Sequence, residues 1–154
     1  CIQTDVICSN GTAWSPDGRT MYYTESFRYA IFAYDFNATT SSLTNRRTFA
    51  EVDRKLDAFS DGLCVDSEGF VWSNQVGIGR VVRYDPAGRI ACQIQLPVPM
   101  AVGCTFGGDD LGTLFITSAR ETMTPQQLQQ APLSGSISAI TPGVKGQAVT
   151  SFNG

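Results

Sequence analysis

Short segments in which every second residue is apolar recur along the chain and are separated by tight turns. One arrangement occurs in three copies: an apolar segment, a turn, and a second apolar or aromatic segment. The copies cover residues 10–24, 61–73 and 102–117, and their turns read Pro-Asp-Gly, Ser-Glu-Gly and Gly-Gly-Asp-Asp. Two alternating segments joined by such a turn predict a β-hairpin.

Each predicted hairpin is followed by two more strand-like segments. The third segments are residues 30–35, 80–85 and 135–140, and the fourth are residues 44–49, 90–96 and 148–152. Four strands in a unit of about 40–50 residues are typical of a β-propeller blade rather than of a sandwich. Helical periodicity is seen over residues 124–131, where Pro125 suits the first turn. We therefore predict an all-β chain.

The predicted blades divide a single domain, residues 1–154, at approximately 10–60, 61–99 and 100–154. Three blades are fewer than the roughly 4–8 that close a propeller ring. The chain also begins at Cys1, without Met, partway through what looks like a strand. We expect it to be part of a longer propeller, and to associate with a missing N-terminal half or with a second copy.

Charge and hydropathy restrict the partners. The formal net charge is −3, and the one basic pair is Arg46-Arg47. Such a chain has no electrostatic footprint for nucleic acid or for an anionic membrane. No apolar run approaches the ~20 residues of a membrane span. We therefore predict that the partners include neither nucleic acid nor a membrane.

The five cysteines are an odd, scattered set without Cys-x-x-Cys spacing. This argues against both a zinc knuckle and a disulfide framework. Cys64 lies in an alternating apolar segment, and Cys104 lies at the matching place in the next copy. We interpret both as buried free thiols that pack as small hydrophobic side chains. Free thiols of this kind favour a cytoplasmic location.

The sequence contains no histidine. This excludes Ser-His-Asp and Cys-His nucleophilic chemistry from the chain, together with every metal site that has a His ligand. Any catalysis here rests on carboxylates, amides, hydroxyls, Lys or Arg, and a metal ion held by oxygen ligands. The sequence lacks the motifs of dinucleotide loops, EF-hands and hydrolase elbows, so we predict no organic cofactor site.

The position before the first glycine of each copy is the candidate site. It is occupied by Asn10, Asp61 and Val102 in the three copies. The innermost strands of a propeller line its central channel, so equivalent positions lie at similar depth around one axis. An amide and a carboxylate there would suit a divalent ion such as Ca²⁺, Mg²⁺ or Mn²⁺. Asn and Asp before glycine also cap turns, and the residues alone leave both readings open.

Several segments, in order along nearly the whole chain, resemble the regucalcin/gluconolactonase family. Residues 9–18 (SNGTAWSPDG) are similar to its S-N-G-[LI]-A-W-S-P-D-G segment, and Ser60-Asp61-Gly62 is similar to its P-D-G. Further similar segments are residues 79–86, 106–108, 114–120 and 142–146. Complete members of the family are longer, and this chain resembles their C-terminal half.

The resemblance implies a six-bladed β-propeller that hydrolyses sugar (aldono-) lactones with a divalent metal ion. The ion, Ca, Zn, Mn, Mg or Fe, would be held by Asn10 and Asp61 and by a Glu from the N-terminal half of the family. It would polarise the lactone carbonyl, while Asp61 would act as the catalytic general base toward the attacking water. The expected small-molecule partner is therefore a sugar lactone.

The chain departs from the family pattern at two places. Ser60 stands where the family usually has Pro before Asp61, and Glu25 stands where it usually has Asp. The third metal ligand also has no counterpart in this sequence. Two alternatives therefore stay open: a non-catalytic, divalent-ion-binding propeller, as is claimed for regucalcin, and an inactive truncated half-propeller.

Overall fold

The computed structural model describes residues 1–149. Their strands are β1 (Ser9–Trp14), β2 (Thr20–Glu25), β3 (Ala30–Asn37), β4 (Ser42–Glu51), β5 (Phe59–Val65), β6 (Val71–Val76), β7 (Arg80–Tyr84), β8 (Ile90–Gln95), β9 (Ala101–Gly107), β10 (Thr113–Ser118) and β11 (Ile137–Ile140). The helical segments are α1 (Pro125–Gln130) and the 3-10 turns Ser26–Arg28 and Arg54–Leu56. The chain is therefore built almost entirely from strands and turns, as predicted.

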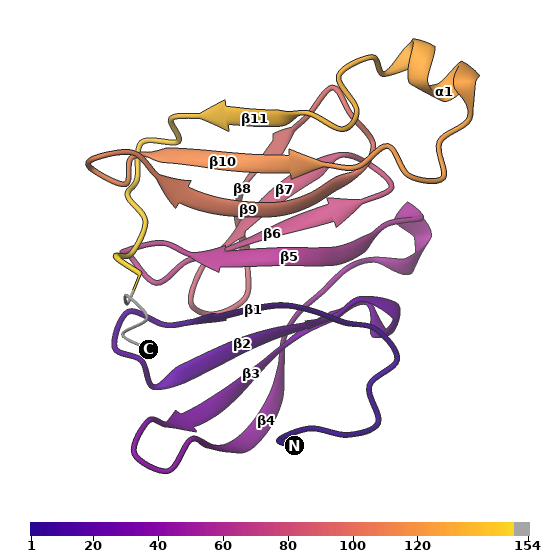
Figure 1. Ribbon diagram of the computed structural model, residues 1–154. Helices are drawn as coiled ribbons and strands as arrows, with labels where there is room; N and C mark the ends of the chain where they lie inside the picture. Colours follow the sequence, from indigo (N-terminus) through magenta and orange to yellow (C-terminus); the bar gives the residue numbers. More distant parts are fainter. Residues whose placement is uncertain (150–154) are drawn as a thin grey trace.

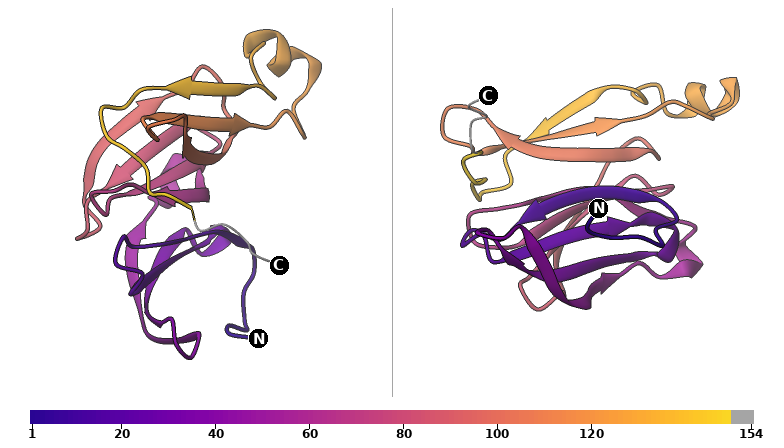
Figure 2. Two further views of the ribbon diagram at one scale, coloured as in Figure 1. Left: turned by 60° about the vertical axis from the view of Figure 1, so that its left-hand side comes forward. Right: turned by 60° about the horizontal axis from the view of Figure 1, so that its bottom comes forward.

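The strands form three antiparallel sheets in which chain neighbours pair (Figure 1). The first sheet is β1-β2-β3-β4, the second is β5-β6-β7-β8, and the third is β9-β10-β11. The sheets fan out face to face, and the inner strands β1, β5 and β9 lie side by side (Figure 2). This is the arrangement of successive propeller blades, so the predicted fold class is confirmed. The predicted strand over residues 148–152 lies largely outside the described residues.

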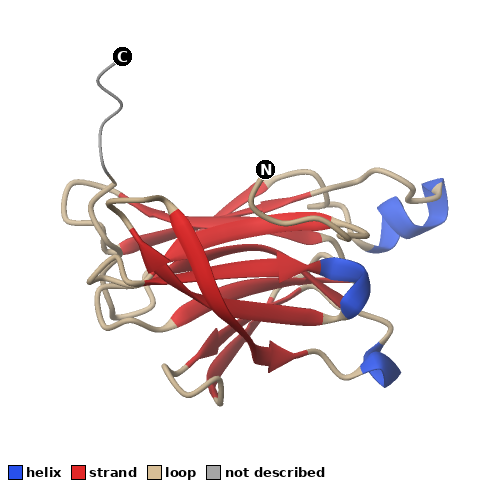
Figure 3. Cartoon of the chain, turned by 90° about the horizontal axis from the view of Figure 1, so that it is seen from below, coloured by secondary structure: helices blue, strands red, loops and turns tan. Residues whose placement is uncertain are grey.

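The short helical segments gather at one end of the sheets, where β1 and β5 begin (Figure 3). The predicted helix is confirmed as α1. Thr124 Oγ1 accepts the N–H of Gln127, whose side chain accepts the N–H of Thr124, and Pro125 opens the first turn. No helix within residues 1–149 has the length and apolar character needed to cross a bilayer.

Two apolar layers join the sheets. The layer between the first and second sheets contains Tyr22, Ile31, Ala33, Ala50, Leu63, Val65, Val71, Val82 and Tyr84. The layer between the second and third sheets contains Trp72, Val81, Leu96, Val98, Ala101, Leu114 and Ile116. Because residues alternate between the two faces of a strand, β6 contributes Val71 to one layer and Trp72 to the other. Each large side chain buried in this way contributes about 1.5–3 kcal/mol to folding.

The repeated glycine allows the inner strands to approach one another closely. A Cβ on Gly11 would lie 2.5 Å from the backbone nitrogen of Leu63. A Cβ on Gly62 would lie 2.7 Å from the carbonyl oxygen of Val102 and 2.8 Å from Gly103 Cα. No side chain fits at either point, so the glycines of the repeat are a packing requirement of the propeller axis.

The outer faces of the terminal sheets are covered to different extents. Residues 1–8 run along the first sheet, where Gln3 Oε1 accepts a hydrogen bond of 3.3 Å from the Tyr34 hydroxyl. On the third sheet, the side chains of Phe115 and Ile137 are 36% and 70% exposed. The expectation that an N-terminal half or a second copy covers such a face stays a prediction.

Candidate functional site

The predicted site positions share one backbone feature. The pairing of β1 with β2, of β5 with β6 and of β9 with β10 shifts register at the same place in each sheet. The shifts fall at Asn10-Gly11, at Asp61-Gly62 and at Val102. A bulge takes residues out of the ladder and redirects a side chain. The bulges therefore present these residues at equivalent points near the propeller axis.

Contact between the first two bulges brings Asn10 and Asp61 together. A Cβ on Gly11 would lie 2.9 Å from the carbonyl oxygen of Asp61, which shows how close the two backbones are. The Asn10 amide lies near enough to the Asp61 carboxyl to act on its pKa, which it lowers. Its Nδ2 also donates a hydrogen bond of 3.3 Å to Ser26 Oγ. Val102, at the equivalent point of the third sheet, adds an apolar side chain instead of an oxygen ligand.

The charge of Asp61 is weakly compensated. The residue is half-buried, and none of the ion pairs among residues 1–149 includes it. Burial raises the pKa of the Asp61 carboxyl, while the contacts with the Asn10 amide and the Gly62 N–H act in the opposite direction. A carboxylate in this situation is stabilised by an approaching cation.

The two departures from the family pattern have different consequences. Glu25 is 1% exposed, and its carboxylate accepts the N–H of Cys8 at 3.0 Å and Arg28 Nε at 2.7 Å. It is thus committed to holding the segment before β1 and the following 3-10 turn. Ser60 is buried on β5 beside Asp61, and its hydroxyl has no hydrogen-bond partner in the described part of the chain.

Sequence reasoning missed two polar residues at this site. Ser26 is fully buried and holds the Asn10 amide. Asn74 lies on β6 opposite the Asp61 bulge, since its neighbours pair with residues on either side of that bulge. Its amide is fully buried, and neither amide atom has a partner among residues 1–149. A polar amide within the wholly buried strand Val71–Val76 is the sequence signal that could have identified it.

The available donors fit a hard divalent ion in type. Asn10 offers an amide oxygen and Asp61 a carboxylate, and such ions prefer oxygen ligands. Within residues 1–149, no group of three or more His, Cys, Asp or Glu side chains is placed to hold an ion. Two donors are fewer than the ~6–8 oxygens around Ca²⁺ or the ~6 around Mg²⁺, so these two residues alone would not complete a coordination shell for either ion.

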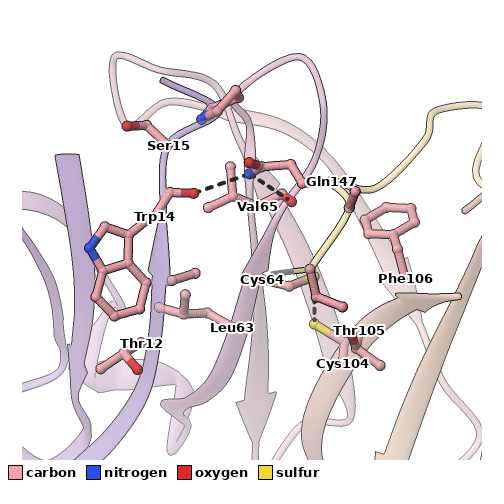
Figure 4. A pocket seen from close by; sticks show the side chains of 14 residues that line it. Thr12, Trp14, Ser15, Leu63, Cys64, Val65, Cys104, Thr105, Phe106 and Gln147 are labelled. Carbon is pink, nitrogen blue, oxygen red and sulfur yellow. Dashed lines mark hydrogen bonds between the residues drawn. The ribbon is translucent and has the colours of Figure 1, made fainter. Parts of the chain in front are cut away.

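A pocket of about 540 Å³ lies further along the inner strands (Figure 4). Its walls come from β1, β5 and β9 and from the segment that carries Gln147. The Gln147 amide closes one side, where Nε2 donates to the carbonyl oxygens of Trp14 at 3.1 Å and Val65 at 3.3 Å. Cys64 and Cys104 both line the pocket, and their sulfur atoms face each other (Figure 4).

Fold and site together define a class: a β-propeller whose inner strands present an amide and a carboxylate at one end of the axis. The chain belongs to the SMP-30/gluconolactonase/LRE-like family, whose profile matches residues 1–120. It is 38% identical to regucalcin of Sus scrofa, covering 94% of this chain and 48% of that protein. It is 37% identical to regucalcin of Homo sapiens, covering 99% of this chain and 50% of that protein. The chain thus spans about half the length of the curated relatives it matches.

Solved structures agree with this assignment. The crystal structure of a calcium-binding protein, regucalcin, from Agrobacterium tumefaciens matches with a TM-score of 0.89 at 27% identity, over 95% of this chain and 50% of that one. A gluconolactonase from Xanthomonas campestris matches with a TM-score of 0.63 at 35% identity, over 75% of this chain and 36% of that one. The predicted family is therefore confirmed.

Proposed function

We propose that the complete protein hydrolyses sugar lactones with a bound divalent ion, and that this chain supplies Asn10 and Asp61 to the site. One observation carries the proposal: the two residues meet at adjacent bulges, where Asp61 is half-buried and has no ion-pair partner among residues 1–149. Membership of the family supports a lactonase-like or regucalcin-type function.

Each of the two residues has a distinct part in the proposal. Asn10 adds an oxygen ligand without adding charge, and its Nδ2 donation to Ser26 leaves Oδ1 as the atom that can coordinate. A divalent ion at this place supplies Lewis-acid polarisation of the lactone carbonyl. Asp61 accepts a proton from the attacking water, for which the raised pKa of its carboxyl is favourable. Water adds to the carbonyl carbon and the ring C–O bond breaks, so no covalent nucleophile is needed.

The test is hydrolysis of glucono- and xylonolactone by the complete protein, followed with a pH indicator, with Ca²⁺, Mg²⁺, Mn²⁺, Zn²⁺ or Fe²⁺ added. We expect ion-dependent turnover that Asp61→Asn lowers by about 10²–10⁴-fold, the usual effect of a general base. Asp109→Asn is the matched control because Asp109 is an exposed carboxylate of the third copy, and it should keep the full rate. Rates equal to the buffer with every ion, or an undiminished Asp61→Asn rate, would overturn the proposal for this chain.

A second candidate function is regucalcin-type ion binding without turnover. What favours it is the similarity to regucalcin, including a solved regucalcin that is described as a calcium-binding protein. Calorimetric titration with Ca²⁺ and Mn²⁺ separates the two candidates. Ion binding that depends on Asp61 without any lactone turnover would support this second candidate, whereas ion-dependent turnover would exclude it.

A further inference from the structure

Two of the five cysteines meet across neighbouring blades. Cys64 on β5 and Cys104 on β9 have their sulfur atoms 3.6 Å apart, and Figure 4 shows the two thiols facing each other. Both pack against the apolar layer between the second and third sheets, as predicted for small hydrophobic side chains, but they are partly buried and not fully buried as predicted. Two neighbouring thiols can be oxidised to a disulfide bond, which neither can form alone. The ion site proposed above does not involve these cysteines.

The backbone sets this proximity. β5 and β9 approach each other closely at Gly62 and Gly103, where a Cβ on Gly62 would lie 2.8 Å from Gly103 Cα. Cys104 directly follows Gly103, and Cys64 comes two residues after Gly62. The thiols therefore lie beside a close backbone contact between β5 and β9.

Small solutes can reach the pair. Both cysteines line the pocket along the inner strands, and both are only partly buried. The hydrogen bond with Cys64, together with burial, raises the pKa of the Cys104 thiol well above its usual range.

We propose that Cys64 and Cys104 are a disulfide-forming pair, which a hydroperoxide reaching the pocket oxidises to a cross-link between the second and third blades. One of the two thiols ionises and attacks a peroxide oxygen, the O–O bond breaks, and a sulfenic acid forms together with one water that takes up the released proton. The other thiol then attacks the sulfenic sulfur and loses its proton, and a second water leaves as the S–S bond forms. Two thiols and one hydrogen peroxide thus give one disulfide and two waters.

The cross-link would tie β5 to β9 beside the Asp61 bulge. It would close a loop between residues that are 40 positions apart in the chain, which restricts the unfolded state. We therefore expect the oxidised protein to melt at a Tm about 5 °C or more above that of the reduced protein. A thiol reductant should reverse the shift.

The test is treatment of the reduced chain with hydrogen peroxide, followed by tryptic digestion without reductant and mass spectrometry. Cys64 lies in the tryptic peptide 56–80, but peptide 90–120 contains both Cys92 and Cys104. The Cys92→Ser variant removes this ambiguity, and Cys92 is exposed on the outer strand β8, away from the pair. In this variant we expect peptides 56–80 and 90–120 to be joined, with a mass lower by two hydrogen atoms.

The same peroxide treatment of the Cys64→Ser and Cys104→Ser variants is the second part of the experiment. Each should abolish the joined peptide and the rise in Tm, while the remaining cysteine advances to the sulfenic or sulfinic acid. The wild-type and Cys92→Ser results stand even where one of these variants folds poorly. Peroxide treatment that leaves peptides 56–80 and 90–120 unlinked, or that links other cysteines in their place, would overturn the proposal.

Discussion

The inner strand of the second blade carries two aspartates, one toward each end, whose surroundings differ sharply. Asp66 directly follows β5, is fully buried, and each of its oxygens accepts two hydrogen bonds. Asp61 lies in the β5 bulge and is half-buried, and none of the ion pairs among residues 1–149 includes it. Hydrogen bonds from donors of its own blade occupy both oxygens of the Asp66 carboxylate. The Asp61 carboxylate, in contrast, can still accept a cation.

The partners of Asp66 explain how a buried charge is tolerated. Oδ1 accepts the N–H groups of Glu68 and Phe70, both at 3.0 Å, which closes the Ser-Glu-Gly turn. Oδ2 accepts Trp72 Nε1 at 2.9 Å and Arg83 Nε at 2.8 Å. A buried carboxylate is stable when all its lone pairs are occupied in this way.

The contrast shows that burial alone does not identify a functional carboxylate. Asp66 is more deeply buried than Asp61, but its hydrogen bonds leave no position for a ligand. Asp61 is less buried, yet the balance of its surroundings raises the pKa of its carboxyl. The number of unoccupied oxygen positions, rather than depth, therefore separates the structural residue from the candidate ligand.

The largest expected effect is on Asp66. We expect Asp66→Asn to lower the free energy of unfolding by about 3–5 kcal/mol, because its NH₂ would face the Trp72 and Arg83 donors inside the protein. Asp85→Asn is the matched control, since Asp85 forms the same turn hydrogen bonds but pairs with the exposed Arg89. Its loss of stability in urea unfolding should be clearly smaller, because water screens an exposed ion pair. Equal losses for both variants would show that the buried hydrogen bonds of Asp66 stabilise the fold no more than the exposed ones of Asp85.

A smaller effect is expected at the glycine that positions Asp61. Gly62→Ala places a Cβ against backbone atoms of Val102 and Gly103, so we expect a loss of about 1–3 kcal/mol in the free energy of unfolding. Gly103→Ala is the control from the next copy, because its Cβ would meet only the Thr117 hydroxyl, at 3.0 Å. Chemical denaturation should show a clearly smaller loss there. An unaffected Gly62→Ala variant would mean that the inner strands can separate at little cost.

The smallest effect is the pH dependence that Asp61 contributes. Because its pKa is raised above the ordinary 3.8, the folded chain holds this proton more tightly than the unfolded chain. Its contribution is therefore most favourable in acid and decreases as the pH rises through the raised pKa. Asp61→Asn removes that decrease, so the variant should gain stability relative to the wild type between pH 4 and pH 7. A stability difference between the variant and the wild type that stays constant over this range would contradict a weakly compensated charge on Asp61.

Much of the fold could be predicted because it is encoded locally. Alternating apolar residues and the turns at Gly18 and Gly69, both with positive φ, predict the hairpins without knowledge of distant contacts. Thr124 and Pro125 likewise predict the start of α1. Asn10 and Asp61 could be named because equivalent repeat positions fall at equivalent places in a propeller, whatever the side chains are.

The sequence by itself therefore determined the strands, the turns, the blade order and the family, since each depends on a short segment or on a repeat. The tertiary structure decided what the polar residues face. Only the tertiary structure shows that Ser26 holds Asn10, that Asn74 lies opposite the Asp61 bulge, and that the approach of β5 to β9 brings Cys64 to Cys104. These relations join residues from different strands or blades, and the free energy of hydrogen bonds, burial and thiol contact depends on distances that no single segment specifies.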